Sequence, residues 1–471
     1  MMKHTPFNYD DLALLTVELP DTIKNLRYSG RFQHVICEID RLLADNTHPN
    51  YDPIMKKRLE LERFLAAELA NDYGTSFEDM VENFREKYPN FTETDLMNLI
   101  NSGHADFMIK TDGIYFENAA YSNLRECCSD YLRKLENPAF VPAPYISEEK
   151  RDNMERMRKN GRHAWHYKVR EWICPDENNE RPGKNVRIWL PFPAITPEQS
   201  DIRLLESSHP AYITDGPIHT AYAEFEYHPG DRFEITLEFT NTAVYHDPRE
   251  SEATGDLPAD VLPYLAEVEP HIVFTPYLKK LAAYLTAGTD NPLAKARRIY
   301  DYVTEHVRYS YTREYRLFDN IPMYAALNGR GDCGVQSLLF ITLCRIAGVP
   351  ARWQSGNAVH TPKNGNSGRI GSHDWALFYV APYGWMHCDP SYGGGAKCDG
   401  DIDAWNWYFC NLDPYRYICC TEFQRQLDPP KTFMRLDPYD NQSGEIEYVD
   451  ECLSYADVNC SKKLLEAERL L

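Results

Sequence analysis

The spacing of apolar residues changes twice along this chain, and this change limits the fold more than any other feature of the sequence. From residue 1 to about 140, apolar side chains recur every three or four positions, as they do in amphipathic helices. Between 160 and about 250, β-branched and aromatic runs alternate with turn clusters, which is typical of antiparallel strands. Helical spacing returns after about 263. The pattern predicts an α+β protein built from about three units.

The first of these regions contains a helix start that can be placed from the sequence. Thr92 and Asp95 form a capping box at the head of an apolar-periodic segment. The residues that follow alternate about Asp112-Gly113, a turn pair favoured in hairpins. A helix, a hairpin and another helix either form a small winged unit or belong to a plain helical packing domain. The second interpretation is the simpler one.

Charge and hydropathy exclude several classes of protein. The chain has 50 lysines and arginines against 71 aspartates and glutamates, a formal charge of −21. An acidic chain without a basic stripe repels phosphate backbones, so we expect no nucleic-acid partner. No apolar run approaches the roughly 20 residues of a transmembrane helix, so we expect no membrane partner. The N-terminal segment lacks the apolar core of a signal peptide, which favours a cytoplasmic location.

The cysteine pattern favours free thiols. The chain contains 13 cysteines, an odd number, and no signal peptide is expected to carry it to an oxidising compartment. No Cys-x-x-Cys pair occurs, so the sequence predicts no structural zinc. We expect neither a metal nor another cofactor.

One of these cysteines, Cys333, stands where a reactive thiol is useful. Gly331 and Gly334 flank it and allow other backbone to approach closely. Apolar residues at helical spacing follow over 335–346, and Gly348 ends that helix. We therefore expect Cys333 at the N-terminus of a buried helix, where free N–H groups and the helix dipole stabilise a thiolate.

Two strand-like runs after this helix carry an imidazole and a carboxylate. His373 begins one run, Asp389 ends the next, and a Tyr383-Gly384 turn lies between them. The turn places His373 and Asp389 nearly opposite each other, so that the carboxylate can orient the imidazole toward a thiol. His387 shares a strand face with Asp389 and is the rival imidazole. Cys388 faces the other side and is expected to be buried and inert.

Four motifs in this part of the chain occur together in a known family. They are Gly331-Asp332-Cys333, the helix end from Arg345 to Arg352, His373-Asp374-Trp375, and Gly384-Trp385 followed by Asp389-Pro390. Over about residues 270–395 the chain resembles the transglutaminase-like superfamily of papain-like cysteine enzymes. The β region before it also resembles the domain often found upstream in bacterial multidomain members.

The resemblance implies a papain-like α+β core in which Cys333, His373 and Asp389 form a catalytic triad. On this basis we expect a helical domain at 1–145, an antiparallel β-sandwich domain at 155–260, and a catalytic domain with a C-terminal extension at 265–471.

The same resemblance implies the chemistry. Cys333 would attack an amide carbonyl of a peptide or protein and release an amine, leaving a thioester. His373 would act as base and then as acid, while Asp389 would hold its tautomer. Water as acceptor gives hydrolysis and an amine gives crosslinking. We favour hydrolysis, because no EF-hand pattern points to a calcium-regulated crosslinker.

The remaining site candidates each have a structural alternative. One oxyanion donor is expected to be the backbone N–H of Cys333. Tyr309 or Tyr311 is a candidate for the second donor, although both also fit packing roles. Trp375 and Trp385 either pack against the hairpin or line the substrate cleft.

Several other segments also have two interpretations. Asp332 fits a helix cap better than a catalytic group. The glycine-rich loop at 361–372 is either a mobile lid or a solvated connector. Trp405 and Trp407 either form a wall of the cleft or are buried in the core. The final segment, SKKLLEAERLL, is expected to form a short amphipathic helix.

Two functions other than amide cleavage in peptides or proteins remain open. The first is a binding or scaffold protein with a transglutaminase-like fold and vestigial turnover. The intact triad argues against it, while the two large regions without assigned chemistry argue for it. The second is a glycopeptide or cell-wall peptide amidase, which conflicts with a cytoplasmic location unless its substrate is a recycled fragment.

Overall fold

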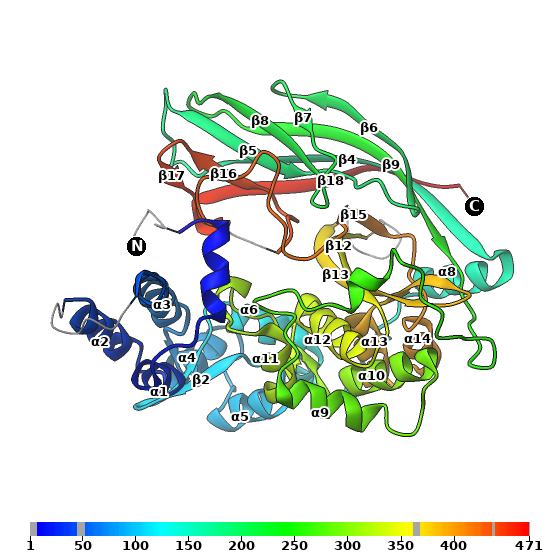
Figure 1. Ribbon diagram of the computed structural model, residues 1–471, viewed down its shortest axis with the longest axis horizontal. Helices are drawn as coiled ribbons and strands as arrows, with labels where there is room; N and C mark the ends of the chain where they lie inside the picture. Colours follow the sequence, from blue (N-terminus) through cyan, green and yellow to red (C-terminus); the bar gives the residue numbers. More distant parts are fainter. Residues whose placement is uncertain (1–6, 45–51, 361–367, 436–438, 471) are drawn as a thin grey trace.

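A computed structural model describes residues 7–44, 52–360, 368–435 and 439–470 of the protein. The predicted mixture of helices and strands is confirmed. Two strand layers lie along one side of a helix-rich body, and a further sheet lies between these two parts (Figure 1). Residues 361–367 of the glycine-rich loop, for which a lid and a connector were both open, lie outside the described residues. Within the described ranges, no helix is both long and apolar enough to cross a membrane.

The N-terminal region is mainly helical, as its apolar spacing predicts. Thr92 caps α5 and forms the predicted box with Asp95. The hairpin at Asp112-Gly113 lies between α5 and α6, in a small sheet of order β1-β3-β2. The elements are η1 (Tyr9–Thr16), α1 (Asp21–Tyr28), α2 (Phe32–Ala44), α3 (Pro53–Asp72), β1 (Thr75–Ser76), α4 (Phe77–Lys87), α5 (Glu93–Asn101), β2 (Phe107–Lys110), β3 (Gly113–Phe116), α6 (Ala120–Cys127) and α7 (Ser129–Glu136).

Two antiparallel sheets form the strand layers of Figure 1. One has the order β18-β4-β9-β6 and the other the order β17-β16-β5-β8-β7. Alternate side chains of β4, such as Tyr167 and Val169, are fully buried in one cluster with residues of the second sheet, as in a sandwich. The elements are α8 (Glu148–Asn160), β4 (Arg162–Pro175), β5 (Asn185–Pro191), β6 (Gln199–Ser207), β7 (Tyr212–Ile213), β8 (Thr220–Glu226), β9 (Phe233–Val244), β16 (Glu445–Tyr448), β17 (Glu451–Cys452), η5 (Tyr455–Asp457) and β18 (Val458–Arg469).

The end of the chain is a strand, and the prediction of an amphipathic helix there is wrong. β18 pairs along β4 from Val458, opposite Pro175, to Arg469, opposite Trp165. Leu, Ala, Lys and Glu favour a helix locally. The open edge of β4, however, offers backbone partners and an apolar face on which Leu464 packs, and these non-local contacts decide the conformation.

A third sheet, of order β14-β13-β12-β15, carries His373 and leads directly to Asp389. Helix α12 packs on it and is buried along nearly its whole length, because other helices cover its remaining sides. The elements are η2 (Leu262–Leu265), α9 (Pro276–Leu285), α10 (Pro292–His306), β10 (Arg308–Tyr309), η3 (Tyr315–Leu317), α11 (Ile321–Asn328), β11 (Arg330–Gly331), α12 (Cys333–Ile346), β12 (Ala351–Val359), β13 (Ile370–Val380), β14 (Gly384–Cys388), α13 (Pro390–Cys398), α14 (Ile402–Trp407) and β15 (Arg416–Cys420).

Strands β12 and β15 join this third sheet to the sandwich. Val359, Tyr417 and Cys419 belong to the same buried cluster as Tyr167 of β4. The hydroxyl of Tyr417 donates a hydrogen bond to the carbonyl of Pro191 in β5 at 2.8 Å. The sheet that positions the site and the β region therefore share one hydrophobic core.

Removal of β18 tests how far the β region depends on it. A chain that stops at Asp457 leaves one long edge of β4 without its partner. Since an unpaired edge exposes backbone groups and apolar surface, we expect the thermal transition to fall by roughly 10 °C and the protein to aggregate. Calorimetry and size-exclusion chromatography measure both effects. Removal of Leu471 alone is the control, and an unchanged transition in the shorter chain would contradict the pairing.

Candidate active site

Cys333 is the first residue of α12, as the sequence predicts. Asp332 caps this helix, and its carboxylate accepts a hydrogen bond from the N–H of Val335 at 3.0 Å. The hydroxyls of Thr312 and Tyr315 donate to the same carboxylate. The expected capping role of Asp332 is confirmed, and this cap fixes the first turn of the helix beneath the thiol.

The thiol of Cys333 contacts a carboxylate that directly follows His373 in the sequence. The residue is 7% exposed, and its Sγ donates a hydrogen bond to Oδ2 of Asp374 at 3.2 Å. A glycine is needed next to the thiol, because a Cβ on Gly334 would lie 2.8 Å from that oxygen. Gln442 donates to the other oxygen of Asp374 and, at 3.2 Å, to the carbonyl of His373. The carboxylate of Asp374 is thus held between the thiol of Cys333 and the amide of Gln442.

His373 and Asp389 meet at the end of the β13–β14 hairpin. Nε2 of His373 lies 2.7 Å from Oδ2 of Asp389. Arg416 of β15 donates to the same oxygen at 3.2 Å, and the N–H of Tyr392 donates to Oδ1 at 2.9 Å. Asp389 is fully buried. The predicted pairing of imidazole and carboxylate is therefore present in the structure.

Tyr392 lies between the two halves of the site. Its ring stacks on the imidazole of His373 with 4.5 Å between centroids. Burial raises the pKa of Tyr392, and Cys333 is among the neighbouring groups that raise it further, so the thiol is also close. Because Nε2 of His373 is engaged with Asp389, Nδ1 is the nitrogen left for the thiol. Among the described residues, Cys333 and His373 share no hydrogen bond.

Burial governs the protonation of these side chains. It raises the pKa of Cys333 well above its usual value, and Asp374 and Asp332 add to this. It also lowers the pKa of His373, which Asp389 offsets only in part. For Asp389, burial is outweighed by His373 and Arg416, which hold its pKa well below the usual range. At neutral pH the site therefore holds a thiol, a neutral imidazole and a carboxylate, and the thiolate expected at the helix N-terminus is not favoured here.

A comparison with protein families places this site. Residues 279–390, which include Cys333, His373 and Asp389, match the family model of the transglutaminase-like superfamily. This stretch is a transglutaminase-like domain. Comparison with curated protein sequences finds no significant match.

Three solved structures show distant similarity. A candidate cysteine protease from Cytophaga hutchinsonii has 14% identity and a TM-score of 0.37, over 66% of this chain and 90% of that chain. The periplasmic domain of TgpA from Pseudomonas aeruginosa has 14% identity and a TM-score of 0.30, over 56% and 97%. A candidate protease from Parabacteroides distasonis has 13% identity and a TM-score of 0.22, over 47% and 42%. At these scores none of them bears on the site.

The two candidate oxyanion donors, Tyr309 and Tyr311, differ in the side chains that lie near them. Tyr309 belongs to β10, which pairs with β11 just before Cys333. Burial raises the pKa of Tyr309, and the neighbouring Cys333 adds to this, so the two side chains are close. The hydroxyl of Tyr311 donates to Glu126 at 2.9 Å and is already engaged. Tyr309 is the better placed of the two, and its role as an oxyanion donor stays a prediction.

The tryptophans Trp375 and Trp385 occupy packing positions. Trp375 is fully buried, and its indole N–H donates to Gln354 at 2.6 Å. Trp385 packs against Tyr379 and beneath the guanidinium of Arg352 near the hairpin turn. A part for either residue in a substrate cleft stays a prediction.

The rival imidazole, His387, has a partner of its own. Its Nε2 lies 3.1 Å from Oε1 of Glu198, in the segment before β6. The neighbouring Cys388 is fully buried, as expected. His373 is therefore the imidazole beside Asp389, while His387 links the β14-β13-β12-β15 sheet to the β region.

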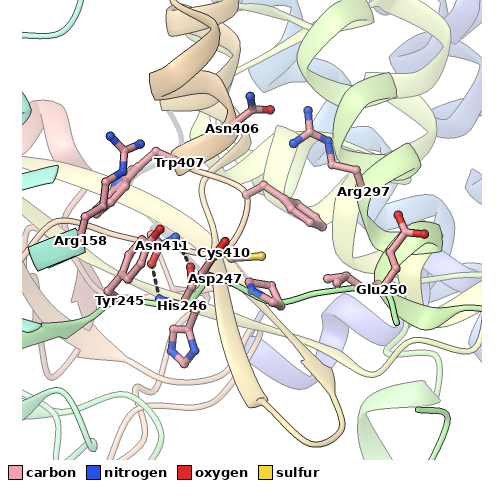
Figure 2. A pocket seen from close by; sticks show the side chains of 13 residues that line it. Arg158, Tyr245, His246, Asp247, Glu250, Arg297, Asn406, Trp407, Cys410 and Asn411 are labelled. Atoms are coloured by element: carbon pink, nitrogen blue, oxygen red, sulfur yellow. Dashed lines mark hydrogen bonds between the residues drawn. The ribbon is translucent and has the colours of Figure 1, made fainter. Parts of the chain in front are cut away.

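One cleft in the described part of the chain, about 340 Å³, lies away from Cys333, His373 and Asp389 (Figure 2). Arg158, Arg297 and Asn406 lie around it, and Trp407 lines it. Trp405 and Trp407 are both at least nine-tenths buried, in agreement with the simpler of their two interpretations. No group of three or more metal-ligating side chains occurs among the residues that the structure describes.

Several residues of the site were not predicted to contact it. Asp374 belongs to the His-x-Trp motif, and strand alternation places it on the face opposite His373, toward α12. Tyr392 lies in the first turn after Asp389. For Asp374 and Tyr392, the nearby sequence therefore indicates a position close to the site. Arg416 and Gln442 reach the site from β15 and from the segment before β16, and no local pattern marks them.

Replacement of Asp374 tests its hold on the thiol. Asp374→Asn removes a negative charge and weakens the acceptor next to Cys333, so the pKa of the thiol falls and the thiolate fraction at neutral pH rises. We expect alkylation of Cys333 by iodoacetamide to be about tenfold faster at pH 7 for each unit by which the pKa falls. Rates across pH, read by mass spectrometry of the peptide, measure this. Asp260→Asn, at an exposed position, is the control, and an unchanged rate in Asp374→Asn would refute the contact.

Replacement of Glu198 tests the link between the β14-β13-β12-β15 sheet and the β region. Despite burial, which acts to raise it, the pKa of Glu198 is lowered from 4.5 to about 2, chiefly by the hydrogen bond from His387. A carboxyl with a depressed folded-state pKa stabilises the fold above pH 4.5, and this contribution is lost as the pH falls toward 2. We expect Glu198→Gln to lower the free energy of unfolding at pH 6 by on the order of 1–3 kcal/mol, and the deficit to shrink toward pH 3.

Urea unfolding of both proteins from pH 6 to pH 3 measures the deficit. Glu250→Gln, which removes an exposed glutamate, is the matched control and should track the unmodified protein. A deficit that does not change with pH would show that the ion pair is not its source.

Proposed function

We propose that the protein cleaves amide bonds of peptides or proteins through a thioester on Cys333, with water as the acceptor. The observation that carries this is the buried hydrogen bond between His373 and Asp389, beside a cysteine at the start of α12. It occurs within a transglutaminase-like domain, and that superfamily supports cysteine-based catalysis. A cytoplasmic location stays a prediction from the sequence.

The proposed steps follow from the hydrogen bonds around the imidazole. Nδ1 of His373 removes the proton of the Cys333 thiol, and the sulfur attacks the carbonyl carbon. The imidazolium, stabilised by Asp389, then gives its proton to the leaving amine as the C–N bond breaks. Water attacks the thioester with His373 again as the base, releasing the acid and restoring the thiol. An amine in place of water would give a new amide, which is the crosslinking outcome.

This proposal requires one local change at the nucleophile. Cys333 now donates its hydrogen bond to Asp374 and must turn toward His373 before proton transfer. A cysteine side chain rotates about a single bond, so we expect a rotamer change to turn the sulfur toward His373. A substrate carbonyl bound above the start of α12 would favour the turned rotamer, since it places sulfur within reach of the carbon.

A binding protein with vestigial turnover is the second candidate function. The raised pKa of Cys333 and its hydrogen bond to a carboxylate favour this alternative, because both keep the sulfur protonated. The complete His373–Asp389–Arg416 network favours an enzyme, because a binding protein gains nothing from an oriented imidazole.

Thiol labelling followed by substrate profiling tests the proposal. We expect iodoacetamide to label Cys333 faster than the fully buried Cys344, and His373→Ala to slow the labelling of Cys333 about a hundredfold. His387→Ala is the matched control and should leave the rate unchanged. Mass spectrometry of a peptide library incubated with the protein and an amine donor then shows whether water or the amine is the acceptor. Labelling of Cys333 no faster than that of Cys344, together with no turnover, would favour the binding protein.

A further inference from the structure

Helix α8, which precedes the β region, is fixed against the transglutaminase-like domain. Arg151 lies 2.5 Å from a carboxylate oxygen of Asp401, and Arg158 lies 2.6 Å from one of Asp403. Both carboxylates lie at the start of α14. The pair at Arg151 holds the first turn of α8, which carries Lys150, and the pair at Arg158 holds the last turn.

The ammonium group of Lys150 lies on the ring of Tyr392, which stacks on the proposed catalytic imidazole. Its Nζ is 3.8 Å from the centroid of the Tyr392 ring, and that ring stacks on His373. In the described part of the chain this cation makes no hydrogen bond and no ion pair. Burial lowers the pKa of Lys150, which reflects the cost of a cation whose donors have no acceptor.

The stem of the β12–β13 hairpin brings a second cation to the same face. The N–H of His360 donates to the carbonyl of Arg369 at 2.8 Å, which extends the ladder in which Gly356 pairs with His373. Strand side chains alternate between faces, so Arg369, Gly371 and His373 share one face. A Cβ on Gly371 would lie 3.9 Å from Nε of Arg369, so the Arg369 side chain lies along the face that Gly371 and His373 share.

The carboxylates near these cations are already engaged. Asp389 and Asp413 both accept hydrogen bonds from Arg416, at 3.2 Å each, and Asp389 also binds the imidazole. Glu149 adjoins Lys150 on α8 and is the third carboxylate that acts on it. None of the three lies within ion-pair distance of the Lys150 ammonium in the described structure, and Arg369 likewise makes no ion pair there.

We propose that Lys150 and Arg369 form a subsite that binds a carboxylate of the substrate, close to the amide bond that Cys333 attacks. A carboxylate in this position accepts charge-assisted hydrogen bonds from both cations, for which the described residues provide no acceptor. The group is either an acidic side chain or a chain-terminal carboxylate. This inference rests on the function proposed above and adds to it a class of substrate, namely acidic peptides.

A pair of alkylating reagents tests the subsite without knowledge of the substrate. In iodoacetate and iodoacetamide alike, the Cys333 sulfur displaces iodide from the methylene carbon, but only iodoacetate carries a carboxylate. The thiolate fraction and the accessibility of Cys333 affect both rates, so they cancel when the iodoacetate rate is divided by the iodoacetamide rate. We expect Lys150→Met and Arg369→Gln together to lower this ratio about five- to tenfold at low salt, and added salt to reduce it in the unmodified protein.

Matched variants separate charge from packing. Lys159→Met removes an exposed lysine from the same helix and should leave the ratio unchanged, while Lys150→Arg should retain most of it. A ratio that stays constant in the double variant overturns the subsite. Equal slowing of both reagents also overturns it, because Lys150 would then position Tyr392 and His373 rather than attract an anion. If Cys333 reacts with neither reagent faster than Cys344, the proposed function itself fails.

Peptide substrates identify the source of the carboxylate. Matched pairs that differ as glutamate and glutamine, or as free and amidated C-termini, are compared for cleavage by the unmodified protein and by Lys150→Met. We expect a preference of about fivefold or more for one carboxylate-bearing partner, lost in the variant. Equal cleavage of both members of both pairs would refute an acidic substrate.

Discussion

The buried carboxylate of Asp389 is the interaction on which the rest of the site depends. It accepts hydrogen bonds from an imidazole on β13, a guanidinium on β15 and the first turn of α13. A buried charge is tolerated only where its acceptor positions are used in this way. Three elements that are distant in the sequence are therefore placed by one group. The orientation of His373 follows from the fold and does not depend on a mobile loop.

The parts of the fold that could be predicted from the sequence have local causes. Thr92 and Asp332 begin helices because their side chains bond to N–H groups a few residues later. His373 and Asp389 could be paired because one tight turn sets the register of the strands that carry them. In each case the deciding contacts lie within about 20 residues of each other.

The parts that could not be predicted depend on partners far along the chain. β18 has the composition of a helix and is a strand only because β4 offers it an edge. Arg416 and Lys150 reach the site from elements on opposite sides of the transglutaminase-like motifs, and nothing near either residue marks it. The protonation state of Cys333 could not be predicted either. The helix start that favours a thiolate was visible in the sequence, whereas the burial and the neighbouring carboxylate that oppose it were not.

The pairing of β4 with β18 also has a consequence for biosynthesis. β4 leaves the ribosome long before β18, and the hydrophobic cluster that they complete includes Tyr417 of β15 and Val359 of β12. A topology with such distant partners has a high contact order and folds slowly. The nascent chain therefore carries an open sheet edge for most of its synthesis, and the cluster shared with the β14-β13-β12-β15 sheet can be completed only once residue 469 has been added.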